Sequence, residues 1–318
     1  MKTPCFTSRL ADRMLQFLSF KRMQGYDYVE GGMNLARFDA FMASRSCQAP
    51  LLRREDLDAY CTELSRTPVA TQAKLLSTVR QFSRYLRAFE TQSVLLAERL
   101  VPRQPSRIRF YPLSAAQVGS LMAATSILRP RGGILPACLR FLIGLLYSTG
   151  LRLGEALALN LGDVDMKDAT LFIRNGKWHK QRLVVMSDST LDALRSWVTL
   201  RGAHAQSQAN DPLLIGQWNQ RLKHGQAQHA FTRLYAHCGI SGSPPPRLHD
   251  LRHNYACGCL QRWREQQPEE DLDALLPVLA NAMGHVDFRS TQHYMHVDAA
   301  TLQRAGARLH THVYSTRG

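Results

Sequence analysis

The sequence predicts a mainly α protein of two domains, the second of which carries a small three-stranded antiparallel sheet. The 318 residues, 45% of them hydrophobic, fit two ordinary domains better than one. The segment from Pro102 to Pro112 contains three prolines, so it can neither continue a helix nor pair fully in a sheet. The second half holds one hairpin signal, Asn175-Gly176, between short alternating segments. We therefore expect a first domain over 1–104, a linker over 105–112, and a second domain with its tail over 113–318.

Helical apolar spacing predicts the elements of the first domain. Two helices are expected over Asp12–Met23 and Met33–Met42, and a third follows Pro68. In that third helix, spacings of four and three place one apolar stripe at Leu75, Val79, Phe82, Leu86 and Phe89.

Basic residues accompany this third helix and the linker. Arg80, Arg84 and Arg87 repeat the apolar spacing one residue on, so they form a stripe beside it. A solvated helix face would explain such a stripe, and a helix laid along DNA phosphates would explain it as well. The residues that we assign to DNA binding are Lys74, Arg80, Arg84, Arg87, Arg103, Arg107 and Arg109.

The second domain opens with a capping box, Ser114 with Gln117, ahead of a helical segment that carries Leu135 to Leu146. That segment ends at Thr149-Gly150, and helical spacing resumes over Leu151–Leu159. Arg152 is thereby placed at the start of a new helix. The strands of the sheet are expected over 163–166, 170–174 and 183–186, and further helices over 191–200, 226–238 and 248–262.

The charge of the chain favours a polyanionic partner. Forty Lys and Arg against 25 Asp and Glu give a formal net charge of +15, which points first to nucleic acid. No run approaches the roughly 18 apolar residues of a spanning helix, so we expect no membrane association. Seven cysteines, an odd number without a disulfide pattern, suit a reducing compartment. We expect a cytoplasmic protein.

Three patterns of the second domain carry chemistry. They are Thr149-Gly150-Leu151-Arg152-Leu153-Gly154-Glu155, Leu248-His249-Asp250-Leu251-Arg252-His253, and Met283-Gly284-His285 with Tyr294 nine positions on. With a hairpin lysine between the first two, the sequence resembles the tyrosine recombinase (integrase) family over about Leu113 to His296. The resemblance implies that the first domain is the family's helical, SAM-like core-binding domain and that the second is its catalytic domain.

Phosphate chemistry explains these residue types. Planar guanidinium groups can each hold two oxygens of a phosphodiester under attack, and Arg152 and Arg252 would do so. His249 lies three residues before Arg252, on the same face of one helix. Attack by Tyr294 gives a 3′-phosphotyrosyl bond that conserves energy for religation, so neither a nucleotide nor a metal cofactor is expected.

The resemblance assigns the remaining roles. It gives His249 a base-like role, makes Lys177 the general acid for the departing 5′-oxygen, and has His285 bind the phosphate and position Tyr294. Lys180 and Arg182 share the hairpin of Lys177 and could exchange roles with it.

Taken singly, several of these residues fit ordinary structural positions. Arg152 alone could be an ion-pair partner of Glu155, and Tyr255 and Tyr235 fit half-buried aromatic positions. A rival hypothesis treats His249, His253 and Cys257 as zinc ligands.

Three function classes follow. The leading one is a site-specific recombinase acting on double-stranded DNA, as a tetramer of protomers on paired sites, for integration, excision or resolution of a mobile element. Chromosome or plasmid dimer resolution is the alternative role. A type IB topoisomerase and an inactive DNA-binding protein are the other classes.

Features outside the motifs add further expectations. The acidic stretch Trp263–Leu275 is longer than the corresponding connection in compact members of the family that the sequence resembles, and either contact with a partner or a solvated loop would explain it. Its acidic residues argue against direct contact with DNA. We expect no additional arm-DNA-binding domain, and a tail over Asp298–Gly318 that packs on a neighbouring protomer.

Overall fold

The computed structural model describes residues 4–45, 50–100, 102, 110–128, 133–174, 181–205, 207–243, 245–266 and 272–284, without the side chains of residues 99, 272 and 273. The chain divides into two compact units, Met1–Arg107 and Ile108–Gly318. Each unit has its own hydrophobic core. Most of the described residues are helical, with one small antiparallel sheet, so the expected fold class is confirmed.

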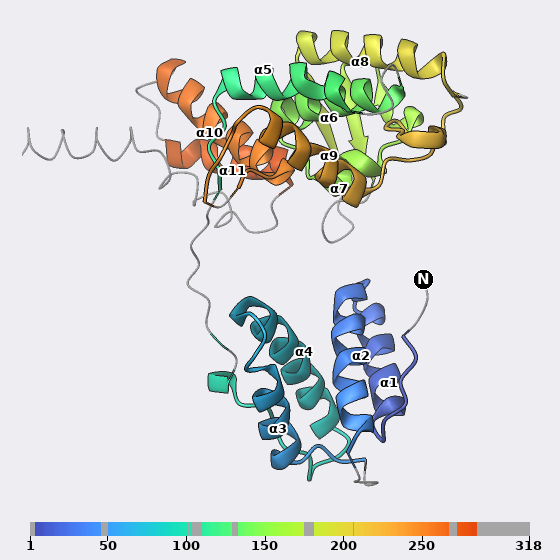
Figure 1. Ribbon diagram of the computed structural model, residues 1–318, viewed down its shortest axis with the longest axis vertical. Coiled ribbons are helices and arrows are strands. Elements are labelled where there is room, and N and C mark those ends of the chain that lie inside the picture. Colours follow the sequence, from blue (N-terminus) through green and yellow to red (C-terminus); the bar gives the residue numbers. More distant parts are fainter. Residues whose placement is uncertain are drawn as a thin grey trace, which may run out of the picture. The chain divides into compact units, whose positions relative to one another are not determined.

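The N-terminal unit is a bundle of four helices (Figure 1). They are α1 (Ala11–Met23), α2 (Val29–Ala43), α3 (Arg54–Leu64) and α4 (Val69–Arg87), followed by the short 3-10 helix η1 (Glu98–Leu100). Both α1 and α2 pack against α4, and α3 packs against α2. The first four members of the predicted apolar stripe of α4 are buried in the bundle core. Phe89 is 52% exposed because α4 ends at Arg87, so its assignment to the stripe was wrong.

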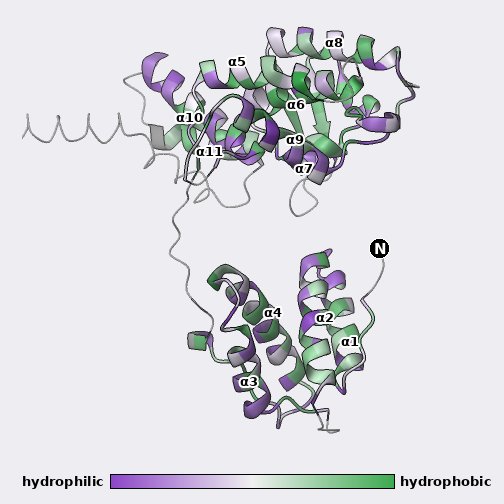
Figure 2. Cartoon of the chain, in the orientation of Figure 1, coloured by the Kyte–Doolittle hydropathy of each residue, from purple (hydrophilic) through white to green (hydrophobic). Residues whose placement is uncertain are grey.

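The C-terminal unit is built around α6 (Ile134–Thr149), against which five other helices pack. Those helices are α5 (Ala115–Ala123), α7 (Leu153–Ala158), α8 (Asp188–Gly202), α9 (His224–His237) and α10 (Leu248–Gln266). Figure 2 shows α6 coloured mostly as hydrophobic, which fits a helix surrounded by others. The predicted capping box is present, since the amide of Gln117 donates to the Ser114 hydroxyl and the amide of Ser114 donates to the Gln117 side chain.

The sheet has the order β1 (Val164–Asp165), β2 (Thr170–Ile173) and β3 (Arg182–Val185), with both pairings antiparallel. Ile173 pairs with Arg182 and Thr170 with Val185. Short 3-10 helices complete this unit at Ala124–Ile127, Leu161–Asp163 and Gln217–Asn219. Among the described residues, none of the helices is long and apolar enough to cross a membrane.

Two helices were absent from the sequence-based expectations. The first is α3. The second is α11 (Leu272–Met283), which packs against α10 and begins within the stretch predicted to be a connection. That stretch is therefore partly helical, because α10 continues to Gln266 before α11 starts. Apolar side chains from the facing sides of α10 and α11 form a small third core.

Candidate active site

Three segments of the C-terminal unit meet where α6 gives way to α7. Gly150 closes α6 with a φ of +64°, a left-handed conformation that favours glycine. A Cβ at this position would lie 2.3 Å from a ring carbon of Tyr255 in α10, so any other residue would have to displace that side chain. Gly150 thus ends α6 and allows α10 to approach the start of α7.

Arg152 stands at the N-terminal cap of α7, as predicted. Its backbone amide donates to the Glu155 carboxylate at 3.0 Å, which satisfies one of the amides left open at a helix start. Its guanidinium donates to Oε1 of Glu155 at 2.7 Å and to the carbonyl of Gly284 at 2.8 Å. The ion pair anticipated for Arg152 taken alone is therefore real, but its carboxylate is buried in the protein.

Arg252 lies in α10 and is only 2% exposed. Its guanidinium donates to the carbonyl of Gly150 at 2.5 Å and to that of Met283 at 2.7 Å. Arg152 and Arg252 therefore hold the carbonyls of two consecutive residues at the end of α11, Gly284 and Met283. These contacts bring the first and second sequence motifs together with the beginning of the third.

His249 occupies the first turn of α10 and keeps part of its surface exposed, whereas His253 one turn later is 8% exposed and stacks on Phe110. The two imidazole rings meet edge to face with centroids 4.8 Å apart. Partial burial, with Arg252 and Arg247 nearby, lowers the pKa of His249 from its usual value. Burial and the neighbouring His249 lower the pKa of His253 to about 4. Both rings are therefore neutral at pH 7.

The zinc hypothesis finds no ligand set within the described ranges. No three His, Cys, Asp or Glu side chains converge there in a way that could hold a metal ion. Cys257, suggested as a ligand one turn beyond His253, packs against the apolar side chains between α10 and α11.

Several predicted site residues lie outside the described residues, and their roles stay predictions. Lys177 falls between β2 and β3, and His285 directly follows Gly284 in the sequence. The others are Tyr294, Arg103, Arg107 and Arg109.

Arg182, which the sequence offered only as a stand-in for Lys177, contributes to this site through Glu155. Its Nη1 and Nη2 donate to the two oxygens of the Glu155 carboxylate at 3.0 and 2.8 Å, and its Nε donates to the carbonyl of Ala282 at 3.2 Å. The only sequence signal for this arrangement was the three-residue spacing of Arg152 and Glu155. We call Arg152, Glu155 and Arg182 the Glu155 cluster.

Gly284 shapes the other side of the Glu155 cluster. Its φ is +67°, and a Cβ there would lie 2.8 Å from Nη1 of Arg182. The backbone conformation favours glycine, and any larger residue would also have to displace the Arg182 guanidinium.

The two tyrosines considered as substitutes for Tyr294 keep structural roles. Tyr255 is half-buried against Gly150, and burial together with Cys259 raises the pKa of its phenol to about 12. Tyr235 packs against the main core of the unit. The raised pKa disfavours a phenolate nucleophile at Tyr255.

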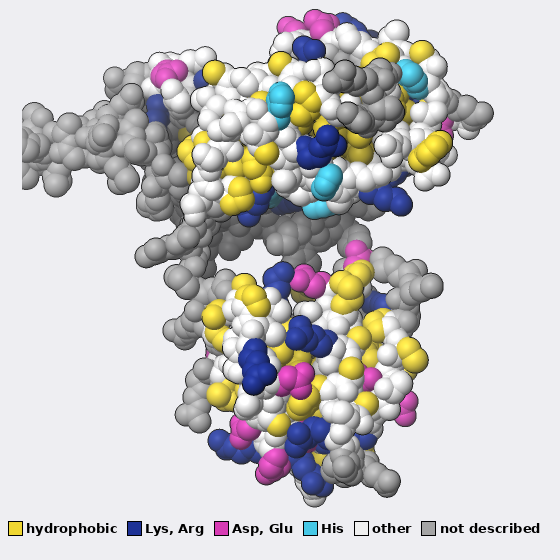
Figure 3. Space-filling view, in the orientation of Figure 1, with side chains coloured by type: hydrophobic (Ala, Val, Ile, Leu, Met, Phe, Trp, Pro, Cys, Tyr) yellow, Lys and Arg dark blue, Asp and Glu magenta, His cyan; other side chains and the backbone are white. Residues whose placement is uncertain are grey.

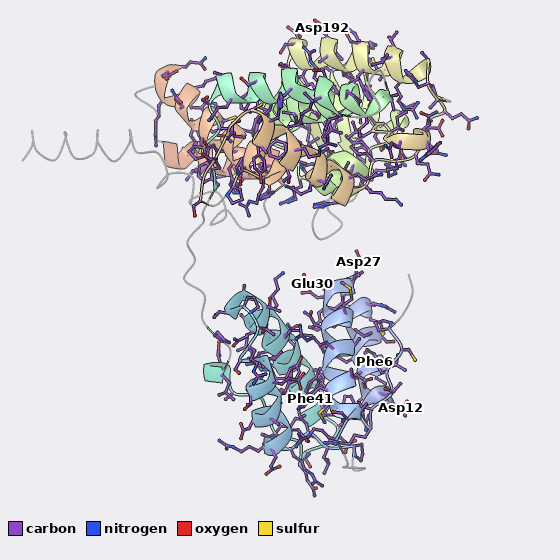
Figure 4. The ribbon with its side chains drawn as sticks, viewed as in Figure 1. Phe6, Asp12, Asp27, Glu30, Phe41 and Asp192 are labelled. Atoms are coloured by element: carbon purple, nitrogen blue, oxygen red, sulfur yellow. The ribbon has the colours of Figure 1, made fainter. Side chains whose placement is uncertain are left out.

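The predicted DNA-binding residues of α4 differ in their surroundings. Lys74 pairs with Glu30 at 2.9 Å, and Figure 4 labels Glu30 near the start of α2. Arg80 is partly buried and pairs with Glu98 at 3.1 Å. Arg84 and Arg87 lie exposed in the last turn of the helix. Figure 3 shows Lys and Arg of this unit interspersed with Asp and Glu on the visible face, so charge is mixed there.

Comparisons with known proteins identify the family of this chain. The sequence profile of the phage integrase family matches residues 112–301. A Sinorhizobium fredii protein designated integrase/recombinase y4rB is 34% identical over 92% of this chain and 95% of its own length. The tyrosine recombinase XerC of Mycobacterium tuberculosis strain H37Ra is 29% identical over 85% of this chain and 88% of its own.

Solved structures share the fold. The XerH site-specific recombinase bound to its palindromic difH substrate covers 87% of this chain and 78% of its own with a TM-score of 0.64 at 17% identity. The Tn1549 transposon integrase in complex with circular intermediate DNA covers 94% of this chain and 99% of its own with a TM-score of 0.64 at 15% identity. With a family profile over most of the second unit and a relative aligned along nearly the whole chain, this protein belongs to the phage integrase family of tyrosine recombinases.

Proposed function

We propose that this chain is a site-specific DNA recombinase that cleaves and rejoins strands through a 3′-phosphotyrosyl bond to Tyr294. One observation carries the proposal. Arg152 and Arg252, far apart in the sequence, both hold the end of α11 immediately before His285. Two guanidinium groups placed together in this way suit the stabilisation of a phosphate that gains negative charge.

Each residue of the proposed site either transfers a proton or stabilises charge during cleavage. The phenolic oxygen of Tyr294 bonds to phosphorus as the bond to the 5′-oxygen breaks, and rejoining reverses both changes. His249, whose lowered pKa keeps its imidazole neutral, takes the phenolic proton. Lys177 gives a proton to the departing oxygen. The positive charges of Arg152 and Arg252 supply the electrostatic stabilisation, so no metal is assigned to the reaction.

The partners follow from the reaction. A strand exchange needs double-stranded DNA sites and further protomers of this chain, and we propose a tetramer on two paired sites. The names of the relatives favour this substrate, since XerH was solved on a palindromic site and such a site offers two related half-sites. We place the protein in the cytoplasm, where its six described cysteines, all unbridged, suit reducing conditions.

Integration, excision or resolution of a mobile element is the role that we propose, following the integrase/recombinase relative. Dimer resolution is the second candidate, because relatives named XerC also align along most of the chain. Sites with inverted half-sites at both ends of a DNA segment that contains the gene would favour the mobile element, whereas a single such site would favour dimer resolution. Relaxation of a supercoiled plasmid that carries no such site would instead favour a topoisomerase.

A nicked suicide substrate tests the reaction directly. After cleavage the short 5′-ended fragment is lost, so the covalent protein-DNA adduct accumulates and can be counted on a denaturing gel. Wild-type protein and Tyr255→Phe should form the adduct, whereas Tyr294→Phe should bind DNA normally and form none. An adduct with Tyr294→Phe, or its loss in Tyr255→Phe alone, would contradict the assignment.

A further inference from the structure

The Glu155 cluster sets two positive groups against one negative group. Side chains of Glu155, Arg182 and Arg152 are 4%, 12% and 24% exposed, so the carboxylate is the most buried and Arg152 the most accessible. The Arg182 guanidinium makes a bidentate contact with both oxygens of the Glu155 carboxylate, while the Arg152 guanidinium contacts only one of them.

The carboxylate of Glu155 is ionised at neutral pH. Burial acts to raise its pKa, but hydrogen bonds from Arg182 and from Arg152 outweigh burial and lower the pKa to about 2. A buried negative charge therefore lies permanently beside Arg152, and a charge in such surroundings acts strongly on its neighbours.

We propose that Arg182 is a positioning residue that neutralises Glu155 and so leaves the positive charge of Arg152 available to the scissile phosphate. The inference rests on the proposed function. Without Arg182, Glu155 and Arg152 would form a neutral pair, and a phosphate beside that pair would meet little net attraction. With Arg182 present, the three groups carry a net charge of +1.

The contacts of Arg182 also fix the geometry around Arg152. Its Nε holds the carbonyl of Ala282, and its guanidinium lies against Gly284. Gly284 in turn offers its carbonyl to Arg152. Arg182 therefore connects the start of β3 with the first turn of α7 and the end of α11. These three segments surround the Arg152 guanidinium, which would face the phosphate.

A direct contact between Arg182 and the phosphate is the alternative, and it makes a different prediction. In that case the side chain would be needed whatever stands at position 155. If Arg182 acts by balancing Glu155, removing the carboxylate should remove the need for it. The two possibilities are separated by a double-mutant cycle.

The cycle compares wild-type protein, Arg182→Gln, Glu155→Gln and the double variant in single-turnover cleavage of the suicide substrate. We expect Arg182→Gln to cleave about 100-fold more slowly, since an unbalanced buried carboxylate opposes Arg152. The cleavage rate of Glu155→Gln should fall by less than about tenfold, because the amide has nearly the shape of the carboxylate. The double variant restores the net charge of +1 and should cleave at least about tenfold faster than Arg182→Gln.

Controls separate the inference from a loss of folding. Arg174→Gln removes the arginine that directly follows β2 and pairs with another buried carboxylate, Asp163, and it should leave cleavage near the wild-type rate. Arg182→Lys keeps the positive charge without the fork, and should retain more activity than Arg182→Gln. Thermal unfolding and DNA affinity are measured for every variant.

The outcomes are distinct. A double variant that is as slow as Arg182→Gln, or slower, would overturn the inference and favour direct contact or a purely structural role. If Arg182→Gln does not fold, Arg182→Lys serves as the test variant instead. A cleavage rate of Arg182→Lys at or below about one hundredth of the wild-type rate would then also overturn the inference. Failure of wild-type protein to form any adduct would instead contradict the proposed function.

Discussion

Two carboxylates from different units of this chain, Glu155 and Glu98, meet arginines in opposite ways. In the C-terminal unit Glu155 is buried and accepts hydrogen bonds from Arg152 and Arg182, each of which is also tied to a backbone carbonyl of the α11 end. In the N-terminal unit the side chain of Glu98 is 71% exposed and meets Arg80 at 3.1 Å. Exposed ion pairs of this kind contribute little to stability and are screened by salt.

The difference shows how one residue type serves two purposes. An arginine fixed by several buried hydrogen bonds presents its charge at one defined position, which a transition state needs. An arginine on an exposed helix face adds attraction for any phosphate within reach, which affinity needs. We therefore expect changes in the first group to affect cleavage and changes in the second to affect the salt dependence of binding.

The largest effect is expected for Arg152→Lys and for Arg252→Lys. Each should slow single-turnover cleavage about 100- to 1,000-fold, because an ammonium group cannot reproduce a planar fork that binds two acceptors. DNA affinity should change little, since each residue meets one phosphate of many. Full cleavage by either variant would remove that arginine from the phosphate site.

Gly284→Ala should come next. Alanine at position 284 would hold a strained left-handed φ, and its methyl group would push the Arg182 guanidinium away from its present position. We therefore expect the cleavage rate to fall about 10- to 100-fold. Gly239→Ala is the matched control, since Gly239 has a φ of +65° with no neighbouring atom within 4 Å of the added carbon. Equal cleavage by the two variants would show that only backbone strain matters.

A smaller effect is expected in the pH profile. If His249 accepts the phenolic proton, its neutral form is needed, and this form exists above the folded-state pKa. Because that pKa lies below the usual 6.5, cleavage should persist as the pH drops below 6.5 and fail only at lower pH. His249→Gln should be about tenfold slower and lack this acid limb. A wild-type midpoint above pH 6.5 would contradict the assignment.

The smallest effect on cleavage is expected in α4. Replacing exposed Arg84 and Arg87 with Ala should reduce the slope of log affinity against log salt by about two, one for each lost phosphate contact. Replacing Lys74 and Arg80, which are engaged by Glu30 and Glu98, should reduce it less. If both pairs lower the slope equally, the ion pairs do not restrain these residues on DNA.

Much of the local structure was predictable because it depends on neighbouring residues. The glycine break at Gly150, the capping box at Ser114 and the three short strands all follow from spacing and turn chemistry. By contrast, α11 was missed because Pro277 lies in its interior, and a proline there argues against a helix. The helix is nevertheless present, packed on α10 through its apolar side.

The site was predictable to a different degree. Arg152, His249 and Arg252 were assigned to the candidate site from motifs, and in the structure Arg152 and Arg252 both donate to carbonyls at the end of α11. The role of Arg182 was not predictable, because its bonds to Glu155 and Ala282 join residues far apart in the sequence, and local spacing carries no information on such contacts. Only the folded chain shows that a buried carboxylate lies between two arginines.

The covalent bond to Tyr294 is central to the proposed reaction, and mapping that bond tests it most directly. Wild-type protein is trapped on the suicide substrate, digested with trypsin and nuclease, and the nucleotide-bearing peptide is sequenced by mass spectrometry. We predict a single modified peptide, with a nucleotide joined through its 3′-phosphate to the oxygen of Tyr294. A nucleotide on any other residue, or a linkage through a 5′-phosphate, would contradict the proposed mechanism.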